Sequence, residues 1–534
     1  KTAYEIPKRD WSSDVCSSDL KIFMSHDDLL KQYDERYAKA LAGGGADKYA
    51  KRTAKGILNA RERIAKLVDG GSFIESGLFG TSGVYPEQAE ETPTDGKIAG
   101  FAKIAGRDVA LVTNDFTVKG ASTSYTNSKK VGHMKRTATE RGMPLVCLGE
   151  STGARLPDAM GGRGMGMLLG NDNTQFRRTR ETPMVAAAFG PSFGSSTWMM
   201  CISDFAVMHK GATVAVSSPG LVSMALGEKV TADDLGGWRL HSDITGLVDQ
   251  AVDTEEEVLE AIKKFLSFMP SHHNEAPPDA PIPPGSGADM AKIFDILPES
   301  RTQVYDVKRV IRCLVDKDTM FELKPRFGKS AVTTLARLGG KSVGIVANNP
   351  LHRGGALDAD ACRKIVDFLV LCDSFNVPIV LLVDTPGFQI GTEAEKAGAP
   401  GRIMNFMNAM TLLTVPHLSV IIRKSYGRAY VCMGGGRHSD EIAAWPSAEI
   451  SFMSPEFATK IVHGVGYGEP GYEAALKDIE QNIDVWGLAS VYAAQAVIKP
   501  QDTREYLIRM LDVYKLRISK GVGQHLMRTW PTSY

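Results

Sequence analysis

GRDVALVTN (residues 106–114) and GKSVGIVAN (residues 340–348) are two copies of one apolar strand pattern. The copies are 234 residues apart (340 − 106). The same offset relates the polar segments ESTG (150–153) and DTPG (384–387). An offset that holds at several separate positions indicates that the chain contains an internal repeat.

Each copy continues with the same order of predicted elements. A strand is followed by a glycine-containing loop, a helix, a second strand with a polar turn, and a third strand with another turn. Strands that alternate with helices and are apolar on both faces are typical of parallel α/β units. Ligands of such units bind at the carboxyl ends of the strands. We therefore predict an α/β fold with two tandem domains and two pseudo-equivalent sites.

Two small-residue turns lie where those sites are expected. The segment RKSYGRAY (423–430) follows the apolar run 418–422, and FGPSFGSST (189–197) follows the apolar run 184–188. With one residue of slip, the repeat aligns the Phe-Gly pair of the first half with the Tyr-Gly pair of the second. A turn of small residues can present bare backbone N–H groups to a ligand. Our hypothesis is that the two turns face each other across one active site.

Composition excludes several classes of protein. Lys plus Arg and Asp plus Glu are both 62, so the net charge gives no sign of nucleic acid or an anionic membrane as partner. No uninterrupted apolar run approaches the roughly 20 residues of a membrane span, and we predict no membrane insertion. The seven cysteines form no Cys-x-x-Cys pair. We expect reduced, buried thiols in a cytoplasmic protein, with no disulfide framework and no metal site.

The repeat and the local composition divide the chain into four segments. Residues 1–20 fit no later pattern and are predicted to be a foreign or disordered leader. Residues 21–270 form the first domain, with a helical arm over 21–70 that contains helical spacing at 27–41 and 49–67. The proline-rich stretch 271–290 is a linker, in which we interpret His272 and His273 as solvated. Residues 291–534 form the second domain.

Seven short motifs, found in order along both halves, resemble one family. They are LNARERI (58–64), NDFTV (114–118), STGAR (151–155), LGG (235–237) with His241, LPES (297–300), DTPGF (384–388) and RKSYG (423–427). From about residue 21 onward, the chain is similar to the carboxyltransferase (β) subunits of biotin-dependent acyl-CoA carboxylases, with propionyl-CoA carboxylase β as the nearest familiar type. Each motif alone is weak, and their shared order makes the resemblance specific.

The resemblance implies a fold and an activity. Each half would have a crotonase-type (ClpP/crotonase) superfold, and the subunits would assemble into a hexamer in which one subunit's first half meets another's second half. The activity would be transfer of a carboxyl group from carboxybiotin to the α-carbon of a short acyl-CoA thioester, with acetyl-CoA or propionyl-CoA favoured. The sequence contains no biotinylation motif and no ATP-grasp loop. A biotin carboxylase and a biotin carboxyl carrier would therefore be separate partner chains.

The resemblance also implies roles for residues of the two turns. Gly194 and Ser195 would donate backbone N–H groups to the acyl thioester oxygen, and Arg428 and Ala429, after Gly427, would serve the biotin oxygen. No side-chain base and no metal are required. The predicted substrate-binding residues are Ser151, Gly153, Ala154, Arg155, Phe193, Tyr426, Tyr430, Val431, Gly387 and Phe388.

Two positions depart from the family pattern. Ser195 and Arg428 stand where family members commonly have a second glycine. Their N–H groups remain usable if their φ angles are negative. Val431, at a position that often sets acyl specificity in the family, predicts an apolar acyl end. An alternative is that Arg428 or Arg353 pairs with a carboxylate of the substrate or product.

Other functions remain open at this point. The same site could run in reverse, in a methylmalonyl-CoA or glutaconyl-CoA type decarboxylase, and the chain could instead be a non-catalytic hexameric scaffold. A crotonase-type hydratase would need acidic residues in the two turns, which contain none. The segment 151–155 lacks the supporting His of a serine hydrolase. We interpret the glycine-rich run 161–166 as a mobile flap of the active site.

Overall fold

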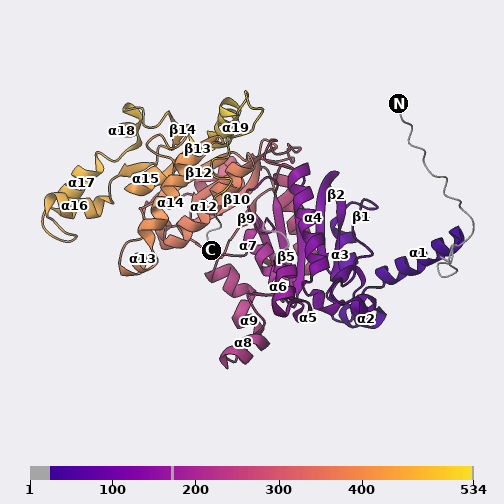
Figure 1. Ribbon diagram of the computed structural model, residues 1–534. Coiled ribbons are helices and arrows are strands. Elements are labelled where there is room, and N and C mark those ends of the chain that lie inside the picture. Colours follow the sequence, from indigo (N-terminus) through magenta and orange to yellow (C-terminus); the bar gives the residue numbers. More distant parts are fainter. Residues whose placement is uncertain (1–24, 170–173, 532–534) are drawn as a thin grey trace, which may run out of the picture.

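The computed structural model describes residues 25–169 and 174–531, and the predicted leader 1–20 lies outside them. Two twisted sheets form the two halves, the first in purple and the second in orange (Figure 1). This arrangement confirms the predicted α/β fold with two similar units. None of the described helices is long and apolar enough to cross a membrane.

The first sheet has the strand order β1-β2-β3-β4-β5-β6-β8, with β7 paired to the end of β5. Strands β3 to β6 and β8 run parallel, whereas β1, β2 and β3 are paired antiparallel. The strands are β1 (Ile74–Glu75), β2 (Lys97–Ile104), β3 (Arg107–Asn114), β4 (Leu145–Ser151), β5 (Met184–Phe193), β6 (Phe205–His209), β7 (Thr213–Ala215) and β8 (Gln250–Val252).

The second sheet repeats this design. Its order is β16-β14-β13-β12-β11-β10-β9, with β15 paired to the end of β13. Strands β11 to β14 and β16 run parallel, and β9, β10 and β11 are antiparallel neighbours. The strands are β9 (Phe321–Leu323), β10 (Ala331–Leu338), β11 (Lys341–Asn348), β12 (Ile379–Thr385), β13 (His417–Tyr426), β14 (Glu441–Ala444), β15 (Glu449–Ser451) and β16 (Ala496–Val497).

Helices at matching places complete the repeat. The long helix after the first parallel strand is α4 (Tyr125–Arg141) in the first half and α12 (Ala359–Ser374) in the second. The short helix that follows each glycine turn is α7 (Ser195–Ile202) or α15 (Arg428–Cys432). The offset of 234 residues therefore reflects duplicated structure, because β2, β3 and β4 each begin 234 residues before β10, β11 and β12.

The helical arm consists of three helices. They are α1 (His26–Leu41), α2 (Ala46–Thr53) and α3 (Ala60–Leu67). The single helical spacing over 49–67 is broken because Gly56 has a φ of 71° and Asn59 starts a new helix with a capping box to Glu62. The expectation of one helix there was wrong in that detail.

The other helices cover the sheets or project from them. They are α5 (Leu156–Ala159), α6 (Gly161–Leu169), α8 (Pro219–Leu226), α9 (Ala232–Gly236), α10 (Glu255–Phe268), α11 (Val307–Leu314), α13 (Thr392–Lys396), α14 (Ala399–Leu412), α16 (Pro455–His463), α17 (Tyr472–Glu480), α18 (Val485–Ser490) and α19 (Thr503–Tyr514). The glycine-rich run 161–166 is helical within α6, and its role as a mobile flap of the active site stays a prediction. In Figure 1, α8 with α9 and α16 with α17 stand away from the sheets.

A shared core joins the two halves. Its residues come from the α3 and α10 side of the first sheet and from α12 and α14 of the second half. The ring of Phe205 on β6 stacks on Phe265 of α10 with centroids 4.7 Å apart, and Phe321 of β9 packs 5.5 Å from Phe205. The two halves are therefore stacked: the face of the first sheet that carries α3 and α10 packs against α12 and α14 of the second half.

The stretch 271–290 has no strand and only the start of a 3-10 helix. His273 is held by the fold: its backbone N–H donates to the C=O of Glu181 (2.9 Å), and the side chain of Asn376 donates to the C=O of His273 (2.7 Å). His272 packs close to Gly142. The interpretation as solvated was wrong for His273, because residues of the C-terminal half bind it, whereas the side chain of His272 remains 34% exposed and agrees with the interpretation.

Candidate active site

The two predicted turns have the same backbone conformation. Gly194 follows β5 and has φ 62° and ψ −120°, and Gly427 follows β13 and has φ 59° and ψ −145°. Glycine adopts this positive φ without the steric cost that a Cβ would impose. Each glycine is followed directly by a helix. The similar sequences of the two turns therefore form the same local structure, at the carboxyl end of the third parallel strand of each sheet.

The helices that follow these glycines begin with unpaired N–H groups. The first intrahelical bonds run from the N–H of Trp198 to the C=O of Gly194 (3.0 Å) and from Tyr430 to Gly427 (3.2 Å). Before these donors, the N–H groups of Ser195, Ser196 and Thr197 in α7 and those of Arg428 and Ala429 in α15 have no acceptor within the helix. Neither glycine-led helix has a side-chain cap. Each turn can therefore offer two backbone donors to a ligand.

Ser195 and Arg428 provide the first donor of each helix. Neither residue is among those with positive φ, so replacing a glycine with a larger residue causes no backbone strain at either position. The hydroxyl of Ser195 lies 2.7 Å from that of Thr123. The side chain of Arg428 is exposed and makes no recorded hydrogen bond or ion pair in the described part of the chain.

A second glycine turn lies beside each of these. Gly153, after β4, has φ 100°, and Gly387, after β12, has φ 127°. A Cβ built on Gly194 would lie 3.5 Å from the Cα of Gly153 and 4.0 Å from the backbone nitrogen of Ala154. Only a substrate-binding role was predicted for Ala154, and the closeness of its N–H to the turn at Gly194 was not predicted from the sequence. The equivalence of residues 150–153 and 384–387 in the repeat is the sequence feature that could have indicated a second turn beside each glycine turn.

Each second turn is fixed by matching hydrogen bonds. The N–H of Gly153 donates to the hydroxyl of Ser151 (3.1 Å), and the N–H of Gly387 donates to that of Thr385 (3.2 Å). Single β-bridges then join Thr123 to Ala154 and Leu357 to Phe388. The hydroxyl of Ser151 is buried and donates to the C=O of Ala121 (3.1 Å). It shapes the loop and is not presented as a nucleophile.

Both strands carry an acidic residue at an irregularity just before these turns. The register of β4 against β5 shifts between Gly149 and Ser151, and that of β12 against β13 shifts between Val383 and Thr385. Glu150 and Asp384 are the residues at the two shifts. An irregularity of this kind re-aims the residues that follow it. Each site thus depends on a buried carboxylate for its local geometry.

The two carboxylates are neutralised by different arginines. Glu150 accepts from Arg63 of α3 (2.9 Å) and from Arg52 of α2 (2.7 Å). The rest of the Arg63 guanidinium binds Glu255 with distances of 2.9 and 2.8 Å. Hydrogen bonds and charge from the two glutamates hold the pKa of Arg63 above its usual range despite burial. The helical arm is therefore part of the support of the first site.

In the second half, Asp384 is bound by the neighbouring strand. Nε of Arg423, on β13, donates to its carboxylate (2.9 Å), and the ammonium of Lys424 lies 3.4 Å away. Arg423 also donates to the C=O groups of Ser300 and Gln303 (3.0 and 2.9 Å). These contacts tie the turn to the segment 300–303.

The remaining predicted residues divide into supporting and accessible ones. Arg155 is buried, and its guanidinium binds Asp95 (2.6 Å) and Ser122, so it supports the loop from below. Phe193 and Tyr426 are buried beneath the turns, and the hydroxyl of Tyr426 donates to Glu449 (2.8 Å). Tyr430 and Val431 are half-buried on α15.

The two turns lie in separate sheets of the chain. No hydrogen bond or ion pair between them is recorded within residues 25–169 and 174–531. That they face each other across one active site stays a prediction. No group of three or more His, Cys, Asp or Glu residues suited to a metal ion occurs in the same described ranges.

A cavity lies directly beneath the first turn. It is bounded by α7, α4 and the strands β2 to β5. Its lining residues are Lys97, Val112, Asn114, Thr123, Ser128, Val131, Cys147, Leu148, Gly149, Gln175, Ala186, Ala187, Ser195, Ser196 and Met199. The rim residues Ser195 and Ser196 belong to the turn itself, so the cavity adjoins the proposed donors.

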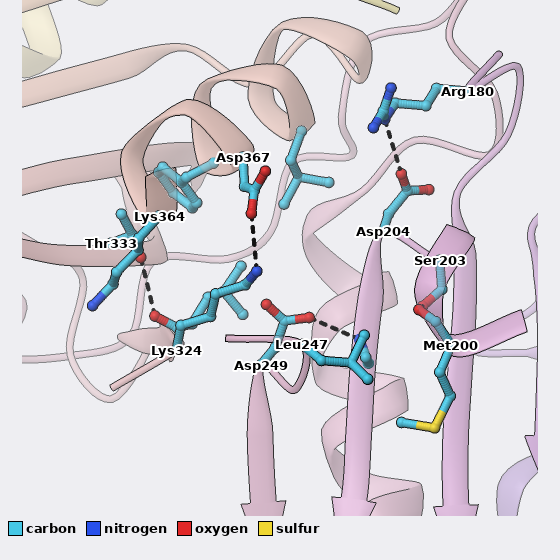
Figure 2. A pocket seen from close by; sticks show the side chains of 14 residues that line it. Arg180, Met200, Ser203, Asp204, Leu247, Asp249, Lys324, Thr333, Lys364 and Asp367 are labelled. Atoms are coloured by element: carbon cyan, nitrogen blue, oxygen red, sulfur yellow. Dashed lines mark hydrogen bonds and ion pairs between the residues drawn. The ribbon is translucent and has the colours of Figure 1, made fainter. Parts of the chain in front are cut away.

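Another cavity lies between the two halves and is lined by charged side chains (Figure 2). The ammonium of Lys324 lies 3.0 Å from Asp367, and the carboxylate of Asp249 accepts from the N–H of Ala206 (2.8 Å). Burial raises the pKa of Asp249 to about 6. Arg180 and Asp204 pair on the opposite wall. No glycine turn lines this cavity, and its polar groups join the halves.

Comparison with known proteins agrees with this arrangement. The model of the carboxyl transferase domain family matches residues 51–520. The chain is 34% identical to the carboxyltransferase subunit of propionyl-CoA carboxylase from Haloferax mediterranei, over 92% of this chain and 97% of that protein. It is 33% identical to the methylmalonyl-CoA decarboxylase subunit alpha of Veillonella parvula, over 89% and 94%.

The same relationship appears among solved structures. The hexameric transcarboxylase 12S subunit with methylmalonyl-coenzyme A bound superimposes with a TM-score of 0.85 at 31% identity, over 92% of this chain and 96% of that one. Duplicated sheets, paired glycine turns and near full-length similarity lead to one conclusion. The chain belongs to the carboxyl transferase domain family and is a carboxyltransferase of the biotin-dependent acyl-CoA carboxylase type.

Proposed function

We propose that this protein is the carboxyltransferase subunit of an acyl-CoA carboxylase and carboxylates the α-carbon of a short acyl-CoA, with acetyl-CoA or propionyl-CoA favoured. The observation that carries the proposal is the repeated turn, in which Gly194 and Gly427 share one backbone conformation and each opens an uncapped helix. Carboxyl transfer needs such a pair, because an oxygen gains negative charge on each of the two reactants.

In this proposal the first turn serves the acyl-CoA. The N–H of Ser195, together with that of Gly194 or Ala154, stabilises the thioester oxygen when the α-proton leaves. A preorganised donor of this kind typically contributes roughly 3–4 kcal/mol. The positive end of the α7 dipole adds to the stabilisation, since the helix has no side-chain cap.

The second turn serves biotin, which is carried by a separate protein. Biotin, when bound, supplies the carboxyl group and accepts the α-proton. In this proposal the N–H groups of Arg428 and Ala429, with that of Phe388 from the neighbouring turn, would hold the ureido oxygen of biotin. Both groups fit the residues present, because the turns offer backbone donors without a competing side-chain acceptor.

Partners and assembly follow from the same proposal. A biotin carboxylase and a biotin carrier supply the carboxylated group, and the subunits form a hexamer in the cytoplasm. The solved 12S relative is described as a hexamer. Exposed apolar side chains on the projecting helices support assembly, among them Leu221, Met224 and Leu226 on α8 and Phe457, Ile461 and Val462 on α16.

The test is transfer of labelled carboxyl from a carboxylated biotin carrier to acetyl-, propionyl- and longer acyl-CoAs by the purified protein. We expect labelled product with at least one short acyl-CoA. No product with any of them, despite a competent carrier, would contradict the proposal.

A decarboxylase is the second candidate. It is supported by the 33% identity to a methylmalonyl-CoA decarboxylase subunit over most of both chains. The same assay run from carboxylated acyl-CoA to free biotin carrier distinguishes the two directions by their relative rates.

A further inference from the structure

Lys97 is a buried lysine without a partner. It is the first residue of β2, is 3% exposed and lines the cavity beneath the first turn. Its ammonium makes no hydrogen bond or ion pair with any residue in the described part of the chain. Burial lowers the pKa of Lys97 to about 8. The buried carboxylate of Asp95 acts on this charge without forming an ion pair with it. A buried cation without an ion pair is costly, so its presence needs a reason.

The neighbouring Lys130 is a buried lysine whose ammonium has hydrogen-bond acceptors. Lys130 of α4 is also buried, and burial lowers its pKa to about 8 as well. Its ammonium donates to the C=O of Thr94 (3.0 Å) and to the C=O of Lys97. The ammonium of Lys130 is therefore used within the fold, whereas that of Lys97 is left to the cavity.

The repeat provides an internal comparison for this cavity. Lys130 corresponds to Lys364, whose ammonium donates to the C=O of Ala331 (2.8 Å), the residue equivalent to Lys97. The second half thus keeps the structural lysine and replaces the cavity lysine with alanine. At this pair of equivalent positions, therefore, only the first half has a lysine, and it has no hydrogen bond or ion pair with the described residues.

The residues that line this cavity are also replaced in the second half. In the second half, four larger aliphatic side chains stand at its equivalent positions and are buried: Leu357 for Thr123, Ile365 for Val131, Leu381 for Cys147 and Val383 for Gly149. In the second half, these aliphatic side chains fill the space that is a cavity in the first half. A partly polar cavity with one cation on its wall is typical of a ligand site.

We propose that this cavity binds a carboxylate of the acyl group, with Lys97 as its counter-ion. The inference rests on the proposed function, which places the thioester at Ser195 on the cavity rim. The acyl group would pass between the apolar side chains of Leu148 and Met199 and end near the ammonium. Gln175 and Ser128 offer additional hydrogen bonds to the same group.

Two acyl groups carry this chemistry. The carboxylate can sit on the α-carbon, as in methylmalonyl-CoA, or at the end of the chain, as in succinyl-CoA. Butanoyl-CoA, which has a chain of the same length as succinyl-CoA and no carboxylate, is the neutral reference. Comparing the Kd values of these three thioesters shows whether a carboxylate adds to the binding of the CoA part, and at which position of the acyl group it does so.

The experiment is calorimetric binding of each thioester to the full chain and to its Lys97→Met and Lys130→Met variants. For the wild-type protein we expect at least one carboxylate-bearing thioester to bind about tenfold or more tightly than butanoyl-CoA. Lys97→Met should remove that advantage and leave the Kd of butanoyl-CoA within about twofold. Lys130→Met, the matched control, should retain the advantage.

The outcomes are distinguishable from failure of the proposed function. An equal Kd for all three thioesters in the wild-type protein, or an advantage that persists in Lys97→Met, would overturn the inference. If Lys97→Met folds poorly, Lys97→Ala, which copies the second half, replaces it. Carboxyl transfer with binding independent of Lys97 contradicts only this inference, and Lys97-dependent binding without any transfer contradicts only the proposed function.

Discussion

The two halves of the chain have the same backbone and different cavities. Gly194 and Gly427 occupy equivalent turns with nearly equal φ angles, 62° and 59°. Beneath the first turn lies a cavity with Lys97 on its wall, whereas Ala331 and buried aliphatic side chains occupy the equivalent places of the second half. The duplication has kept the turn and changed the space behind it, as expected if both turns hold a reactant oxygen and only the first holds an acyl group, as we propose.

The halves also differ in how their turns are supported. Asp384 is neutralised by Arg423 of the adjacent strand, inside the repeat. Glu150 is neutralised by Arg63 and Arg52, which belong to the helical arm outside the repeat. The second site is therefore built from its own half, and the first depends on a segment that precedes it. Four predictions test this comparison.

The largest effect is expected from proline at the turn glycines. Gly194→Pro and Gly427→Pro should each lower carboxyl transfer by at least about a thousandfold, because proline cannot adopt the positive φ and the donors move. Transfer rates with a carboxylated carrier measure this, with gel filtration to follow assembly. Gly285→Pro, at an exposed positive-φ glycine in the linker, is the control and should retain activity. Normal turnover in either turn variant would show that its donors are not used.

The second largest effect is expected from removal of Arg63, and it concerns the stability of the fold, not the rate of carboxyl transfer. Arg63→Met leaves Glu150 and Glu255 buried without their shared cation, which should cost about 3–5 kcal/mol in the free energy of unfolding. Urea denaturation measures this loss. Arg61→Met, which breaks a more exposed pair with Glu75, should cost about 1 kcal/mol or less. Equal losses in the two variants would mean that the arm does not support the first site in this way.

Lys97→Met should stabilise the protein. The pKa of Lys97 is about 8 in the folded chain, against an ordinary 10.5, so at pH 7 its protonated form costs the folded state about 3 kcal/mol. Between pH 8 and 10.5 the unfolded chain holds the proton that the folded chain has lost, so wild-type stability rises with pH. The advantage of Lys97→Met should therefore shrink over that range. Asp95, Arg155 and Cys147 supply the other charges that act on this lysine.

Unfolding midpoints of both proteins at several pH values test this prediction. Lys130→Met is the comparison: burial lowers the pKa of Lys130 to about 8 as well, so the same trend with pH is expected, but its loss leaves the C=O groups of Thr94 and Lys97 without a donor and should stabilise the protein less than Lys97→Met does. A constant difference between Lys97→Met and wild type from pH 7 to 10 would contradict the assigned pKa.

The smallest effect is expected from alanine at the turn glycines, and it separates the two half-reactions. An alanine at positive φ costs roughly 1–2 kcal/mol, so a slowing of about tenfold is expected. Gly194→Ala should slow α-proton exchange of the acyl-CoA, and Gly427→Ala should slow decarboxylation of the carboxylated carrier. The second should be slightly worse, because its Cβ would lie 3.1 Å from the C=O of Phe452. Equal slowing of both half-reactions by either variant would break the assignment of one reactant to each half.

Much of the fold was predictable because its signals are local. The strands at 106–114 and 340–348, the glycine turns and the helices after them are each determined by a few neighbouring residues, and the fixed offset links them. One detail that was wrong is the single helix over 49–67, which is divided at Gly56. The run 161–166 is rich in glycine and forms a helix, which its composition did not indicate.

The site was predictable only in its backbone. The sequence by itself determined that there are two glycine turns at equivalent places, because positive φ and small residues leave a direct pattern. The pairing of Glu150 with Arg63, 87 residues apart, and the approach of Ala154 to Gly194 were decided by the tertiary structure. So was the isolation of Lys97, because the presence or absence of a partner for a buried charge depends on which distant segments pack around it.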